Sequence, residues 1–251
     1  MVLRKTYEKQ LEELNQELID MGALCEDAIG FVAMALPGET ETAGAAVHDV
    51  DPSAGQEPTQ LIERVYFADS QIDRSEREIE ALCLKLLLRQ QPVATDLRLV
   101  SAALKMISDM ERIGDQCADI ADIVRVLDAK KAIKLESAVD IQAMATATMK
   151  MVTKAVDSFV SRNLVVARGV IEADDTVDDL FNKVKSELIA LVAKEPEQGE
   201  VLLDLLMVAK YFERIGDHAT NIAEWVEFSI TGEHEAKAKY QKVGEDLAEK
   251  K

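Results

Sequence analysis

The chain carries one block of sequence twice. Residues 111–115 and 213–217 both read Glu-Arg-Ile-Gly-Asp, and the earlier segments 68–73 and 173–178 also match in their acidic and apolar positions. The step from the first repeated Asp to the repeated Glu is 42 residues in one copy (69 to 111) and 39 in the other (174 to 213). Blocks that recur in the same order at nearly the same spacing predict one structural unit that occurs twice.

Each copy is predicted to consist of three long helices. The first begins with apolar residues at spacings of three and four, namely Leu11, Leu14, Leu18, Met21, Leu24, Ala28 and Phe31, and this is the pattern of an amphipathic helix. Pro92 and Pro196 fall at matching places between the repeated blocks, where one helix should end and the next begin. The expected helices are 3–36, 59–90, 93–128, 135–165, 167–194 and 198–230. Short connections between them predict an all-α fold of two tandem antiparallel three-helix bundles.

The predicted domains follow from this repeat. Residues 1–130 form the first three-helix repeat, 131–230 form the second, and 231–251 form a polar C-terminal tail. Residues 37–58 contain three of the five prolines and have no counterpart of similar length in the second copy. We interpret 37–58 as an exposed insertion loop, which is either a tolerated surface loop or a segment that binds a partner.

Composition restricts the partners and the compartment. The formal net charge of −18 means that nucleic acid and anionic lipid surfaces would both repel the chain on average. No secretory signal is recognised, and no segment approaches the ~20 apolar residues of a membrane span. Cys25, Cys83 and Cys117 lie far apart in apolar helical patterns, which favours a role as small core residues in a reducing cytoplasm.

The repeated acids lie on the apolar side of their helices. Residues on a helix turn by ~100° each, so Glu111 and Asp115 share one face, and Val100, Leu104, Ile107 and Ala118 lie within ~40° of Glu111. Asp119 and Asp122 extend the acidic line. The other repeated pairs have the same placement; they are Asp69 with Asp73, Asp174 with Asp178, and Glu213 with Asp217.

Carboxylates among leucines cost several kcal/mol each unless they are paired, protonated or bound to metal. Two such pairs on neighbouring antiparallel helices would give four carboxylates per bundle, a ligand set that suits Mg²⁺, Mn²⁺ or iron and also admits zinc. The competing interpretation is a solvated acidic face bridged by Arg112 and Arg214. A ferritin-like di-iron site needs Glu-x-x-His, and no histidine of the chain follows a Glu at that spacing, which disfavours an oxidase.

Three further residues lie beside the acids. Gly114 and Gly216 each lie between the two acids of a block, and a glycine inside a helix suggests close approach by another group. His218 points ~100° away from Asp217 and is replaced by Gln116 in the other copy, so we expect a surface histidine.

These residues resemble a known family. The four acidic pairs look like the E(D)-x-x-x-D motifs of PhoU proteins, and 89–98, 104–115 and 209–224 match their surroundings. The resemblance covers nearly the whole chain apart from 37–58 and the tail. It implies two three-helix bundles, which in some members carry multinuclear clusters of iron or zinc on the bundle surface. By this resemblance the ligands here would be Asp69, Asp73, Glu111, Asp115, Asp174, Asp178, Glu213 and Asp217.

The resemblance also implies a function. PhoU proteins are negative regulators of phosphate uptake and of the phosphate-starvation response, and they act with the phosphate ABC transporter, its ATPase subunit and a sensor histidine kinase at the cytoplasmic membrane face. We therefore expect a cytoplasmic, metal-binding adaptor, a homodimer, that is not an enzyme and does not bind nucleic acid. The sequence holds no Gly-rich phosphate loop and no nucleophile paired with a base. The alternatives are a carboxylate-bridged metal-dependent enzyme, a hydrolase or oxidase, and a purely structural helical adaptor without metal.

Overall fold

The computed structural model describes residues 2–36, 57–129 and 141–233. Its helices are α1 (Val2–Ala35), α2 (Pro58–Gln90), α3 (Thr95–Ala129), α4 (Ile141–Val160), α5 (Leu164–Lys194) and α6 (Gly199–Thr231), and a 3₁₀ turn, η2 (Pro196–Gln198), precedes α6. The described part of the chain contains no strand, so the predicted all-α fold is confirmed. The insertion at 37–56, the start of the predicted fourth helix and the tail from 234 lie outside the described residues.

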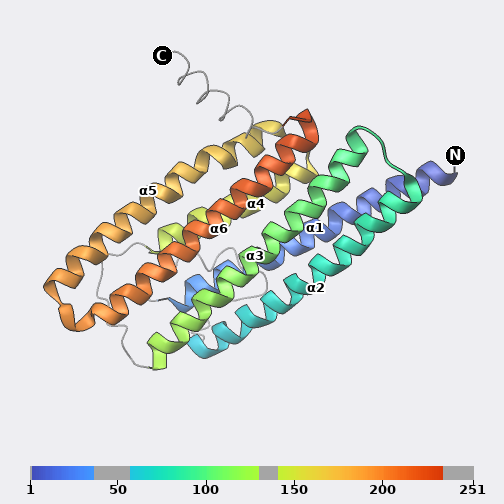
Figure 1. The fold of residues 1–251 in the computed structure, drawn as a ribbon. Helices are drawn as coiled ribbons and strands as arrows, with labels where there is room; N and C mark the ends of the chain where they lie inside the picture. The colour runs from blue at the N-terminus through green and yellow to red at the C-terminus, as the bar shows by residue number, and fades with distance from the viewer. Residues whose placement is uncertain (1, 37–56, 130–140, 234–251) are drawn as a thin grey trace, which may run out of the picture.

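The helices pack as two antiparallel three-helix bundles side by side (Figure 1). The first bundle holds α1, α2 and α3, and the second holds α4, α5 and α6. Apolar residues at helical spacing bury one side of every helix, as the sequence pattern predicts. In α1, Leu14, Leu18 and Met21 are fully buried. All three cysteines are free and buried, and burial raises their pKa values, so they are small core residues as expected.

The two bundles meet mainly through α3 and α6, which run antiparallel (Figure 1). Arg98 Nε donates to the Ser229 carbonyl at 3.4 Å near one end of this interface. Further along α3, Asp109 contacts His218 of α6, and Asp119 accepts a hydrogen bond from Tyr211. Along these contacts the α3 residue numbers rise while the α6 numbers fall, so the two helices run antiparallel. Since α3 and α6 are the third helices of their repeats, equivalent helices face each other.

Helix boundaries differ from the prediction at the α4–α5 connection. The predicted fourth helix reaches 165 and the predicted fifth begins at 167, but α4 ends at Val160 and α5 begins at Leu164. The reason is Asn163, whose side chain accepts hydrogen bonds from the Val165 and Val166 backbone N–H groups and so caps α5. Pro92 and Pro196 both lie in connections, where they were expected.

Candidate functional site

The eight predicted site residues lie on four neighbouring helices. Asp69 and Asp73 are on α2 and Glu111 and Asp115 are on α3, so they share the first bundle. Asp174 and Asp178 are on α5 and Glu213 and Asp217 are on α6, in the second bundle. Asp178 and Asp217 are exposed, and the other six are half-buried. The acids therefore lie at the edge of the apolar core and not in its centre.

Helices α2 and α3 bring the first acidic cluster together. We use this term for Asp69, Asp73, Glu111 and Asp115. Burial raises the pKa of Asp69 to about 6, and the negative charges of Asp73, Asp115 and Asp119 add to the shift. The pKa of Glu111 is raised by burial and by Asp115, and Arg112 partly offsets this. Carboxylates of α2 and α3 therefore lie near enough to repel one another.

Part of this charge is already balanced. Arg112 pairs with Asp115 at 2.8 Å and with Glu111 at 3.4 Å, although its own side chain is exposed. This is the arginine bridge of the competing interpretation, and it reaches only the α3 pair. Among the described residues Asp69 Oδ1 is buried and has no hydrogen-bond partner. An unpartnered carboxylate oxygen is chemically suited to a hard cation.

Gly114 explains how Asp69 reaches the core edge. A Cβ atom built on Gly114 would lie 2.9 Å from Asp69 Oδ1 and 3.1 Å from Ile72 Cδ1. In the second bundle a Cβ on Gly216 would lie 3.3 Å from Val177 Cγ1. The close approach predicted for both glycines is confirmed, because α2 and α5 press against them at these points.

The second acidic cluster is made of Asp174, Asp178, Glu213 and Asp217. It also places two acids on each of two packed helices, but other side chains contact these acids. Burial raises the pKa of Asp174, the charge of Asp178 adds to the shift, and Thr220 Oγ1 opposes it by donating to Asp174 Oδ1 at 3.3 Å. Although Asp217 is exposed, packing beside its carboxyl raises its pKa, and Glu213 and Asp174 raise it further. Lys210 pairs with Glu213.

One observation speaks against a preformed metal site in these clusters, and another is compatible with metal binding. Across 2–36, 57–129 and 141–233, no group of three or more His, Cys, Asp or Glu side chains is already arranged to hold a metal ion. The donor set is nevertheless all oxygen, and a bound cation would offset the mutual repulsion of the carboxylates. The residues present therefore fit a hard cation, which would be held by the acids of each cluster.

Sequence reasoning missed the contacts that cross between helices. His218 is 18% exposed and its Nδ1 lies 2.9 Å from Asp109 Oδ1 on α3, so the expectation of a surface histidine is wrong. Asn221 Nδ2 donates to the same oxygen at 3.1 Å. Thr220 lies one helical turn after Asp217, on the same face of α6. This position is the sequence signal that could have predicted its hydrogen bond to Asp174.

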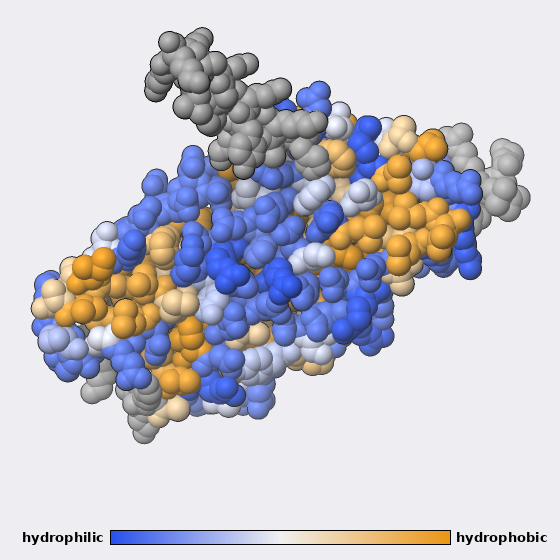
Figure 2. All heavy atoms as spheres, in the orientation of Figure 1, coloured by the Kyte–Doolittle hydropathy of each residue, from blue (hydrophilic) through white to orange (hydrophobic). Residues whose placement is uncertain are grey.

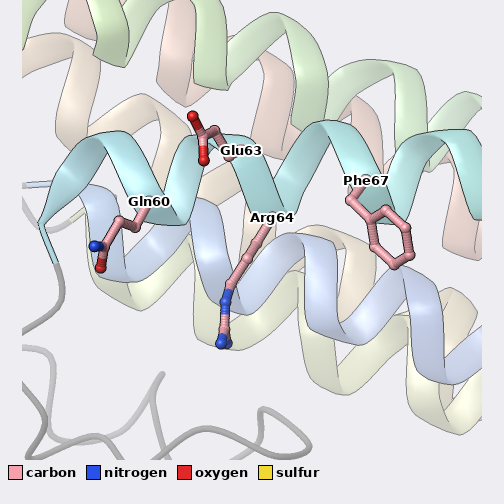
Figure 3. A pocket seen from close by; sticks show the side chains of 4 residues that line it. All are labelled: Gln60, Glu63, Arg64 and Phe67. Carbon is pink, nitrogen blue, oxygen red and sulfur yellow. The ribbon is translucent and has the colours of Figure 1, made fainter.

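A hollow lies on the surface of α2. It has a volume of about 350 Å³ and is lined by Gln60, Glu63, Arg64 and Phe67. Figure 3 shows that all four come from α2, so no second described helix supplies a converging polar group. The Arg64 guanidinium carbon lies 5.3 Å from the centre of the Phe31 ring, so the Arg64 cation is engaged in a cation–π contact with α1.

The stability of the folded protein should depend on the protonation of Asp69. In metal-free protein the pKa of Asp69, about 6, exceeds its value of 3.8 in the unfolded chain, so the folded state holds its proton more tightly. The free energy of unfolding should therefore fall as pH rises between these two values. For a half-buried group the loss is about 1 kcal/mol. Chemical denaturation of chelated protein across this range tests it. Asp69→Asn should flatten the slope and Ser70→Ala should not; an unchanged slope in Asp69→Asn contradicts the assignment.

Comparison with known proteins gives consistent results. The family model described as "PhoU domain" matches twice, at residues 41–124 and 141–226. A "phosphate-specific transport system accessory protein PhoU homolog" of Clostridium acetobutylicum is 33% identical over 91% of this chain and 96% of its own length. A homologue with the same name from Pseudomonas aeruginosa is 30% identical over 92% of this chain and 87% of its own length.

Solved structures share the fold. The crystal structure of PhoU from Pseudomonas aeruginosa superposes with a TM-score of 0.77 at 30% identity and covers 90% of this chain and 100% of that one. The phosphate transport system regulatory protein PhoU from Streptococcus pneumoniae gives a TM-score of 0.73 at 22% identity, with 91% and 98% covered. At that lower identity the likeness concerns the fold alone.

Proposed function

The chain belongs to the PhoU family, and we propose on that basis that it is an accessory protein of a phosphate-specific transport system, in which it acts as a negative regulator of phosphate uptake and of the phosphate-starvation response. The observation that carries this proposal is the double match of the PhoU domain, one copy in each half of the chain. Relatives that align over almost the entire chain have the corresponding name. The regulator works in the cytoplasm.

Its partners are the ATPase subunit of a phosphate ABC transporter and a sensor histidine kinase. No helix of the described residues is long and apolar enough to cross a membrane, and the role proposed here needs none. The formal charge of −18 supports docking on basic protein surfaces and disfavours nucleic acid. The protein restrains both partners when phosphate is plentiful.

The two acidic clusters are the proposed cation sites. Asp69, Asp73, Glu111 and Asp115 would hold one site, and Asp174, Asp178, Glu213 and Asp217 would hold the other. Iron or zinc is proposed from the family, and Mg²⁺ or Mn²⁺ would suit the oxygen donors. A bound cation supplies positive charge that offsets the mutual repulsion of these carboxylates. The buried, unpartnered Asp69 Oδ1 supports the assignment.

We propose an adaptor and not an enzyme. The PhoU family is one of accessory and regulatory proteins. The adaptor proposal expects metal-loaded protein to turn over neither phosphoesters nor peroxide. Turnover that is lost when the cluster acids are neutralised would favour the carboxylate-bridged hydrolase or oxidase instead.

A homodimer is proposed as the working form. Light scattering at micromolar concentration should give twice the mass of the 27.7 kDa chain, and monomer alone at that concentration would reject the dimer.

Binding to the proposed ATPase partner should depend on salt. The chain should bind the purified ATPase subunit at low salt, and affinity should fall as salt rises, because the Debye length shortens to ~8 Å at physiological strength. Titration calorimetry at several salt concentrations provides the measurement. An unrelated helical protein of similar negative charge is the control, since equal binding by both would show nonspecific attraction. Absence of binding even at low salt would count against the proposed role at the transporter.

A further inference from the structure

The two acidic clusters occupy equivalent positions of the repeat, on the face that α2, α3, α6 and α5 form together (Figure 1). Figure 2 shows that the middle of this face is mainly hydrophilic and that apolar areas lie toward its two ends. A cation that arrives from solvent therefore meets polar and charged side chains there. The side chains around the two clusters differ at equivalent positions, and such differences set how strongly each cluster attracts a cation.

The largest difference lies at one pair of facing positions. In the first bundle, Ser108 Oγ of α3 donates to Glu76 Oε1 of α2 at 3.4 Å. The repeat places Lys210 of α6 and Phe181 of α5 at the equivalent positions, and Lys210 Nζ lies 5.4 Å from the centre of the Phe181 ring. An acid and a hydroxyl in one bundle are thus replaced in the other by an aromatic ring and the ammonium group that lies over it.

Each of these pairs borders its acidic cluster. Burial raises the pKa of Glu111, and the charge of Glu76 adds to the shift. Lys210 pairs with Glu213, and its charge opposes the rise in pKa that desolvation causes at Asp217. The first bundle therefore adds a negative charge beside its proposed ligands at the place where the second bundle adds a positive one.

The acids on α2 and α5 differ as well. Asp69 Oδ1 is buried and has no hydrogen-bond partner among the described residues, whereas Asp174 Oδ1 accepts a hydrogen bond from Thr220 Oγ1. Burial raises the pKa of Asp69 to about 6, and Asp119 is one of the acids that add to the shift. The neutral Asn221 takes the place of Asp119 in the second copy. The carboxylate on α2 is therefore the less satisfied of the two.

Basic side chains pair with acids in both clusters and do not reverse this order. Arg112 pairs with both α3 acids of the first cluster, and Lys210 pairs with one α6 acid of the second. Arg214, the repeat equivalent of Arg112, is exposed and lies near Tyr211, where its charge opposes the rise in pKa that burial causes. Among the described ion pairs, each cluster thus has one base.

One additional acid lies beside the second cluster. Asp175 occupies the place of Ser70 in the first copy, and its charge adds to the rise in pKa that burial causes at Asp174. It balances one of the two acids, Glu76 and Asp119, that act on the first cluster alone. Within the described part of the chain, the first cluster therefore keeps the larger excess of negative charge.

We propose that the first acidic cluster binds a hard divalent cation more tightly than the second, and that Lys210, held over Phe181, is the residue that weakens the second site. This inference rests on the cation sites proposed above. An ammonium group fixed beside carboxylates repels an incoming metal ion, and it must give up its pairing with Glu213 when that ion binds. As the supply of cation falls, the second cluster empties first while the first stays filled.

The test measures Mn²⁺ binding to chelated full-length protein, with free Mn²⁺ followed by its electron paramagnetic resonance signal. Glu213→Gln with Asp217→Asn leaves the first cluster, and Glu111→Gln with Asp115→Asn leaves the second. The dissociation constant of the protein that keeps the first cluster should be lower by about tenfold or more. At saturating Mn²⁺ the two proteins should bind equal amounts, because the clusters differ in affinity and not in number.

Exchanging the neighbours between the copies should exchange the affinities. In the protein that keeps the second cluster, Phe181→Glu with Lys210→Ser should tighten Mn²⁺ binding by about tenfold. In the protein that keeps the first cluster, Glu76→Phe with Ser108→Lys should weaken it by a similar factor. Lys154→Ser, which removes an exposed lysine from α4, is the matched control and should change the affinity of the second cluster little.

The gain of affinity is the informative result, because a misfolded variant would lose binding and not improve it. Equal dissociation constants for the two single-cluster proteins would overturn the ranking and leave the cation sites in place. An equal gain in Lys154→Ser would show that only the total charge matters and would contradict the role given to Lys210. Absence of Mn²⁺ binding in both single-cluster proteins and in wild type would remove the cation sites and the ranking together.

Discussion

Deleting the gene is expected to leave the phosphate-starvation genes active in phosphate-rich medium, at the level seen in starved cells. The reason is that the negative regulator proposed here would restrain its partners only while it is present. The double match of the PhoU domain assigns the chain to a family whose members are named accessory proteins of phosphate transport. A reporter fused to a phosphate-starvation promoter gives the measurement, together with the rate of phosphate uptake.

Reintroducing the wild-type chain should restore repression and so exclude an effect on neighbouring genes. Unchanged reporter expression and unchanged uptake in the deletion strain, together with failure to bind the ATPase subunit at low salt, would remove the regulatory role. The protein would then be a metal-binding protein of another purpose.

Neutralising two acids of one cluster is expected to remove about half of the bound metal, because we propose one site in each bundle. Glu111→Gln with Asp115→Asn should empty the first site and leave the second. Elemental analysis of protein isolated without chelators gives the stoichiometry. Chelation should also lower the free energy of unfolding, since a ligand that binds only the folded state stabilises it.

Two controls sharpen this comparison. Glu213→Gln with Asp217→Asn should remove the other half, and the combination of all four changes should remove nearly all of the metal. Glu8→Gln with Glu12→Gln changes an exposed acidic pair of the same i, i+4 spacing on α1 and should remove none. Unchanged stoichiometry in the first variant would contradict the assignment of these carboxylates.

Much of this fold could be predicted because helices are encoded by the spacing of apolar residues along short stretches of the chain. Helical periodicity places Leu14 and Leu18 in the core, and both are fully buried. The repeat correctly paired the helices within each bundle. The end of α4 was misplaced because the periodic apolar pattern continues through the connection, whereas the cap by Asn163 depends on two hydrogen bonds that periodicity does not report.

The surroundings of the acids were harder to predict because they depend on helix packing. Helical angle alone puts Glu111 in the apolar stripe, yet it lies half-buried at the edge of the core. The Arg112 pairs follow from spacing along one helix. The contact between His218 and Asp109 joins residues 109 positions apart and requires the way in which α3 and α6 cross. The metal ligands themselves stay a prediction.

The central claim is that the acidic clusters are needed for repression of the phosphate-starvation genes, and one experiment tests it directly. The deletion strain is supplied with a chain in which all four α3 and α6 acids are neutralised, as Glu111→Gln, Asp115→Asn, Glu213→Gln and Asp217→Asn, at an abundance verified by immunoblot. Reporter expression is then measured in phosphate-rich medium. If cations held by these carboxylates are needed for restraint, the promoter should stay as active as in the deletion strain. Full repression by this metal-free variant would contradict the claim that the acidic clusters carry the function.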